Sequence, residues 1–191
     1  MSAHIVDPYQ TRLLWGNSLL VICCIFYLAW WRLAFRPRNP YKGLGTKILL
    51  LLAVAAGIAA VAFMAQGISA APHAASLFPA HSILWGGIAV YLILLAVSYF
   101  VFRRQVTTEL FLIVGWAMLE LSVLDVLFSS GRFGLQTAVL LIVAIGVTVL
   151  ISLVCYLLYY RLKPEAGYVD GMIPLIAAAV AAAGVAAAAV I

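Results

Sequence analysis

The chain alternates between long apolar stretches and short polar ones. A helix needs about 20 apolar residues to cross the hydrocarbon core of a bilayer, and six stretches reach that length. The predicted membrane-spanning helices are residues 13–35, 48–68, 83–102, 108–128, 135–160 and 172–191. We therefore expect an all-α bundle, because helices satisfy their own backbone hydrogen bonds in lipid.

The composition agrees with one integral membrane domain over residues 1–191. Of the 191 residues, 67% are hydrophobic and 9% are charged, whereas a soluble domain carries roughly 25% charged residues. No polar stretch is long enough to fold separately. The first apolar run lacks the basic segment that precedes a signal peptide and is longer than its apolar core, so we expect it to be retained.

The basic residues predict the orientation in the membrane. If the N-terminus lies outside, nine basic residues fall in inner loops and two in outer ones. The inner set is Arg32, Arg36, Arg38, Lys42, Lys47, Arg103, Arg104, Arg161 and Lys163, and the outer set is Arg12 and Arg132. Short loops rich in Lys and Arg stay inside. We expect a multi-pass protein of the cell membrane with both termini outside. Topology accounts for the net charge of +5, so nucleic acid is not an expected partner, whereas membrane lipid is.

Two stretches resemble one another. The first predicted helix ends in YLAWWRLAFRP (Tyr27–Pro37) and the fifth in YLLYYRLKP (Tyr156–Pro164). One interpretation is that helices 1–2 and helices 5–6 are parallel two-helix repeats, as in some transporter folds. The other is that interfacial aromatic residues followed by cytoplasmic Arg produce such strings without repetition.

The second and sixth predicted helices are dense in small residues. Ala53 and Gly57 form a pair of small residues four positions apart, and so do Gly184 and Ala188. Such pairs let helix backbones approach closely in lipid. We expect these two helices to lie centrally in the bundle, or to contact a second copy of the chain or a partner membrane subunit.

The fourth predicted helix carries two acidic residues, Glu120 and Asp125. A carboxylate at the bilayer centre costs roughly 2.5–3.5 kcal/mol on insertion scales, so it marks a functional site by default. Glu120 lies about 18 Å along a helix of about 30 Å, and Trp116 lies one turn before it on the same face. Asp125 falls on another face, about 140° away. It lies nearer the outer interface, where it either pairs with Arg132 or contacts water.

Other polar side chains share the outer half of the membrane with Glu120. Asn17 belongs to the first helix and Gln66 to the second. We predict an outward-facing polar pocket with Glu120 at its base and Trp116 as an apolar or stacking wall. Asn17, Gln66 and Asp125 would donate or accept hydrogen bonds there. The predicted function is binding and translocation of a small solute, with Glu120 changing protonation or pairing with a cationic group.

Two alternatives stay open. In the first, Glu120 is protonated and bonds a neighbouring or partner helix, and the protein is a non-catalytic structural or assembly subunit. In the second, the protein is a lipid-modifying enzyme, although no nucleophile or metal cluster stands out. The chain lacks a phosphate-binding loop and the HExxH, CxxC and GxSxG motifs. His73 and His81 in an outer loop, without Cys or a nearby acid, are a weak metal signal. We therefore expect no catalytic residue, no cofactor and no metal.

Overall fold

The computed structural model describes residues 8–36, 40–41, 43–71, 76–79, 81–103 and 108–190. Most of these residues are helical, and no strand occurs among them. Six segments are long and apolar enough to span a membrane, which confirms the predicted fold class. The elements are α1 (Pro8–Ala34), α2 (Leu44–Ala70), α3 (Ser82–Phe100), α4 (Thr108–Ser129), α5 (Leu135–Leu158), the 3₁₀ turn η1 (Tyr159–Arg161), α6 (Pro164–Asp170) and α7 (Ile173–Val190).

The first two helices begin earlier than predicted. α1 begins at Pro8 rather than at residue 13, and proline suits the first helical position because its missing N–H would have no partner there. The polar start of this helix is packed rather than solvated, since Tyr9 and Gln10 are buried. α2 likewise begins at Leu44 rather than at residue 48.

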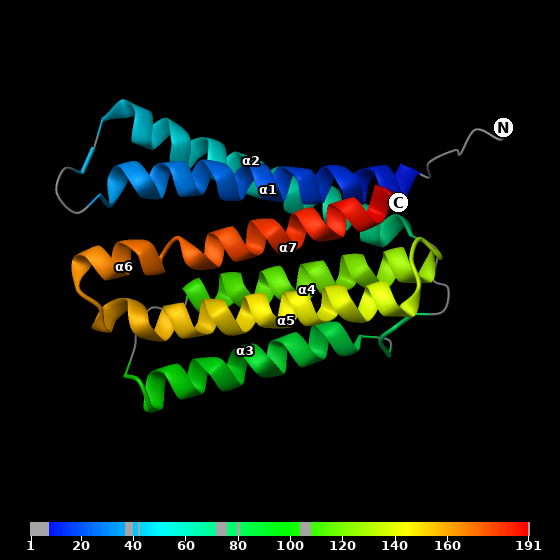
Figure 1. Cartoon of the computed structure of the whole chain (residues 1–191). Helices are drawn as coiled ribbons and strands as arrows, with labels where there is room; N and C mark the ends of the chain where they lie inside the picture. Colours follow the sequence, from blue (N-terminus) through cyan, green and yellow to red (C-terminus); the bar gives the residue numbers. More distant parts are fainter. Residues whose placement is uncertain are drawn as a thin grey trace.

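Across the bundle the helices pack in the order α2, α1, α7, α5, α4 and α3 (Figure 1). α1 and α2 form an antiparallel hairpin, and α1 also packs against α7. α7 packs on α5, α5 on α4, and α4 on α3. The N-terminal and C-terminal ends lie at the same end of the bundle (Figure 1). An even number of spans requires this arrangement.

α3 lies at the edge of the bundle and packs mainly on α4. Ser98 is its one buried residue. The Ser98 hydroxyl shares a hydrogen bond of 2.8 Å with the Tyr156 hydroxyl of α5. The rest of α3 is partly or fully exposed, as suits a helix that faces lipid on most sides.

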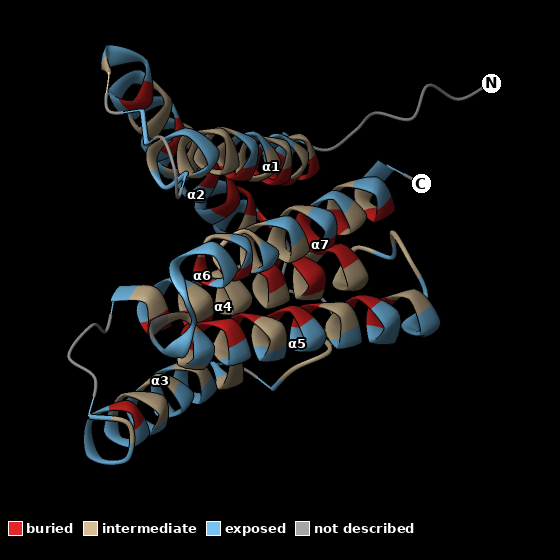
Figure 2. Cartoon of the chain, turned by 60° about the vertical axis from the view of Figure 1, so that its left-hand side comes forward, coloured by how far each residue is buried: buried red, intermediate tan, exposed pale blue. Residues whose placement is uncertain are grey.

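The apolar core lies between α1, α2, α4, α5 and α7. Leu13 of α1, Met64 of α2, Leu124 and Leu127 of α4 and Val185 of α7 have no exposed surface and belong to one cluster. Figure 2 shows the buried positions on the faces that the helices turn toward one another. The outer faces are also apolar, which matches a lipid environment.

Small residues bring α1 and α2 into close contact. A Cβ atom on Gly16 would overlap the Met64 side chain, and one on Gly67 would lie 2.6 Å from Leu13 Cδ2. Ala53 and Ala60 are buried on the same helix. The small-residue face of α2 therefore packs on α1 at one side of the bundle, whereas α7 lies between α1 and α5.

The last span consists of two helices rather than the single helix predicted over residues 172–191. α6 precedes α7, and together they form an apolar segment over Pro164–Val190. Pro174 has no N–H to donate to the carbonyl of Asp170 four residues earlier, so a continuous helix would lose this bond. The chain instead makes a turn, in which the Met172 N–H donates to Val169 O at 3.0 Å.

Candidate functional site

Glu120 occupies a core position of α4. It lies on the same face as Val123, Leu124 and Leu127, all of which have 0% exposed surface. Glu120 is itself 0% exposed. Neither carboxyl oxygen has a hydrogen-bond partner among the residues that the structure describes. The Cys24 thiol of α1 lies within electrostatic range of it. A charged carboxyl group in such a setting destabilises the fold, so we expect it to bind a ligand or a proton.

Two of the other predicted site residues also have a buried polar atom without a partner in the described part of the chain. One is Trp116, whose indole Nε1 is sealed from solvent, and the other is Asn17, through its Oδ1 atom. The Asn17 amide nitrogen is occupied, because it donates to Leu13 O at 3.1 Å. Asn17 and Glu120 each lie about 13 Å from the end of their helix on the N-terminal side of the bundle. Three of the five predicted site residues thus lie in the interior with a free polar atom.

Asp125 has a structural partner that the sequence did not indicate. Its Oδ1 atom accepts hydrogen bonds from the Leu77 N–H at 2.6 Å and from the Phe78 N–H at 3.4 Å. Arg132 donates instead to the Gln10 Oε1 atom, while contact of Asp125 with water stays a prediction. The segment that precedes α3 folds over α4 and brings unpaired backbone N–H groups to the carboxylate. Asp125 therefore anchors this segment.

Gln66 lies apart from the buried group. Gln66 is exposed on α2, and its backbone carbonyl accepts a hydrogen bond from Ser69 Oγ at 3.1 Å. The structure thus buries Asn17 and Glu120 fully and Trp116 partly, whereas Gln66 is exposed and Asp125 is bonded to the segment before α3. Two surface cavities, of about 690 Å³ and about 440 Å³, are lined by other residues and leave Glu120 covered.

The described residues contain no group of three or more His, Cys, Asp or Glu side chains arranged to hold a metal ion. His73 lies outside the described residues. His81 precedes α3, where it is exposed and has a left-handed backbone conformation with φ of 62°.

Asp170 is a buried acidic residue that the sequence did not single out. It ends α6, is 7% exposed, and lies beside the Cys155 thiol of α5. Its Oδ2 atom lacks a partner within the described ranges. The sequence placed Asp170 in a loop before the sixth span. The break between α6 and α7 instead carries it into the bundle.

Comparison of the chain with protein-family models, with curated proteins and with solved structures gives no match. The inferences about function below therefore come from the side chains of this chain alone.

Proposed function

We propose that this six-span membrane protein binds and translocates a small cationic solute, with Glu120 as the residue that neutralises its charge. The observation that supports this proposal is the complete burial of Glu120 with both carboxyl oxygens unpartnered among the described residues. An acidic residue in such a place destabilises the fold unless something binds it. A bound cation would remove that cost.

Two other predicted site residues offer groups that suit a substituted ammonium ion. The Glu120 carboxylate supplies the charge, and the Asn17 Oδ1 atom is a free acceptor for an N–H group. Trp116 lies one turn before Glu120 on α4, and an indole face attracts cations that lie within about 6 Å of the ring. Carboxylate, amide oxygen and indole together form a set that an amine can use.

The structure shows this region closed, so loading requires a movement. Glu120 has no exposed surface, and the α1–α2 hairpin packs on α7 across the core. A shift of the hairpin relative to α4 and α7 would open the region to one side. Rocking of one helical unit against another about a central site is a common route of transport.

Carbodiimide labelling tests the proposal. Dicyclohexylcarbodiimide modifies protonated carboxyl groups in apolar surroundings, and mass spectrometry locates the product. We expect it to label Glu120, with protection by methylammonium or choline but not by sodium at equal ionic strength. Proteoliposomes should accumulate radioactive methylammonium, and Glu120→Gln should abolish this uptake. The matched control is Glu165→Gln, because Glu165 is exposed on α6. Uptake by Glu120→Gln equal to that of the wild type would refute the proposal.

A structural or assembly role is the second candidate function, and the position of α3 favours it. α3 packs mainly on α4 and leaves most of its apolar surface open, including Leu92 and Ile93. A partner helix could cover this surface, whereas it could not reach Glu120, which the chain itself buries. Photocrosslinkers at Leu92 and Ile93 should then yield a protein adduct in native membranes. Lipid adducts alone would contradict the assembly role.

A further inference from the structure

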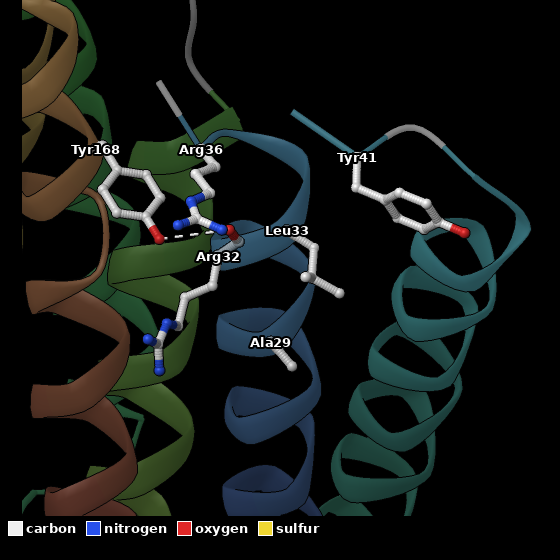
Figure 3. Close-up of a pocket in the computed structure, with 6 residues that line it drawn as sticks. All are labelled: Ala29, Arg32, Leu33, Arg36, Tyr41 and Tyr168. Carbon is white, nitrogen blue, oxygen red and sulfur yellow. Dashed lines mark hydrogen bonds between the residues drawn. The ribbon is translucent and has the colours of Figure 1, made fainter. Parts of the chain in front are cut away.

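A groove lies at the end of the bundle opposite to the two termini. It has a volume of about 690 Å³ and is lined by Ala29, Arg32, Leu33, Arg36, Tyr41 and Tyr168. Figure 3 shows that it crosses the last turns of α1, with α6 on one side and the start of α2 on the other. None of the six lining residues is acidic. The groove is distinct from the buried group around Glu120.

The two sides of the groove differ in chemistry. The guanidinium groups of Arg32 and Arg36 lie on the side of α1 that faces α6 (Figure 3). The Tyr168 hydroxyl lies beside them and donates to Arg32 O at 3.4 Å. On the other side, Ala29 and Leu33 present an apolar wall toward α2 (Figure 3). Like charges on the same side of the groove repel, and an anion between them would relieve the repulsion.

One wall of the groove is held firmly in place. The Trp31 indole N–H donates to Tyr168 O at 3.0 Å, which ties the end of α1 to α6. Trp31 also stacks on Phe35, with ring centroids 4.4 Å apart. The part of this wall that carries Arg32 is therefore built on packed aromatic residues.

The aromatic residues also indicate the depth of the groove in the membrane. Trp30, Trp31 and Tyr159 surround the same end of α1. Trp and Tyr gather where the hydrocarbon meets the headgroups. The guanidinium group of Arg36 thus lies at the level of lipid phosphates at the end of α1, whereas that of Arg32 reaches back to the level of Ala29 (Figure 3). Arg is well suited to phosphate because its planar fork can form paired hydrogen bonds.

The geometry points to a binding site for a phosphate-bearing anion, supplied either by the headgroup of an anionic phospholipid or by free phosphate. Arg32 and Arg36 bind the phosphate oxygens, and Tyr168 lines the same side. When the source is a lipid, its acyl chain lies along Ala29 and Leu33 between α1 and α2.

Native mass spectrometry of the full chain in detergent tests this site. The probes are phosphatidylglycerol, phosphatidylcholine and inorganic phosphate. We expect the wild type to retain phosphatidylglycerol in preference to phosphatidylcholine. The double variant Arg32→Gln/Arg36→Gln should bind phosphatidylglycerol about 30-fold more weakly. The single variant Arg36→Gln, at a residue beyond the end of α1, should weaken binding about 5-fold. It provides a second test of the site if the double variant does not fold.

The matched control is Arg161→Gln/Lys163→Gln. It removes the same two charges from exposed residues that do not line the groove, and it should bind phosphatidylglycerol like the wild type. Selective binding of phosphatidylglycerol without binding of inorganic phosphate identifies a lipid as the source. Binding of inorganic phosphate that is lost in the double variant identifies the free anion. Equal loss of phosphatidylglycerol in the control variant, or no preference over phosphatidylcholine in the wild type, would overturn the inference.

Discussion

Replacing Glu120 by methionine should stabilise the protein. The side chain is fully buried, and both carboxyl oxygens lack a partner among the described residues. A buried polar group left unsatisfied costs about 1–3 kcal/mol. Methionine has a similar length, fills irregular space and removes both oxygens. We therefore expect Glu120→Met to raise the free energy of unfolding by about 1–3 kcal/mol.

The measurement is equilibrium unfolding by SDS in mixed micelles, followed by circular dichroism. Glu120→Gln keeps a polar group of similar size at the same place, so it should remain close to the wild type. Glu165→Met makes the same chemical change at an exposed position in the first turn of α6, where loss of an acid from a helix N-terminus should lower stability by about 0.3–1 kcal/mol.

The opposite outcome would have a definite meaning. If Glu120 formed a hydrogen bond between helices, Glu120→Met would destabilise the protein by about 0.6–2 kcal/mol. Such a loss would show that the carboxyl group is a structural contact, and the reasoning from an unpartnered acid would fail. If Glu120→Met raised the free energy of unfolding and abolished methylammonium uptake, the wild-type protein would be less stable because it keeps a carboxyl group that uptake requires.

Three further changes test other parts of the structure. Gly171→Ala should lower the free energy of unfolding by about 1–3 kcal/mol, because the added Cβ would overlap the Trp31 indole; a neutral result in the same titration would mean that the ring moves aside. Ser98→Ala and Tyr156→Phe should show a coupling energy of about 0.6 kcal/mol in a double-mutant cycle, the average for hydrogen bonds between membrane helices, and strict additivity would argue against their hydrogen bond. A cysteine at Asn39 should react only with membrane-permeant reagents in intact cells, and its labelling by an impermeant maleimide would reverse the predicted orientation.

The sequence was sufficient to predict the spans because length and hydropathy alone decide them. The burial of Glu120 also followed, since the residue shares a helical face with Val123, Leu124 and Leu127. The exposure of Gln66 could not be predicted in the same way. α2 is apolar on every side, so no polar stripe indicates which face turns toward α1.

Contacts made by connecting segments could not be predicted from the sequence, for a different reason. The hydrogen bonds from Leu77 and Phe78 to Asp125 depend on the path of the segment before α3, and hydropathy carries no information on such a path. Asp170 falls just before the predicted sixth span over residues 172–191, so hydropathy does not predict its burial. Its burial depends on the turn near Pro174, which tertiary packing positions.

The packing of α1 against α7 has a consequence for biogenesis. Leu13 and Val185 are both fully buried in one cluster, yet they come from helices that leave the ribosome far apart in time. The α1–α2 hairpin can form as soon as α2 has been inserted, but the side of α1 that α7 covers must face lipid or an insertion factor until translation has almost ended. Contacts between segments so distant in sequence form slowly. A chain that stalls before α7 therefore presents an unfinished core within the bilayer, and this exposed side of α1 is the feature by which a membrane chaperone or protease would recognise it.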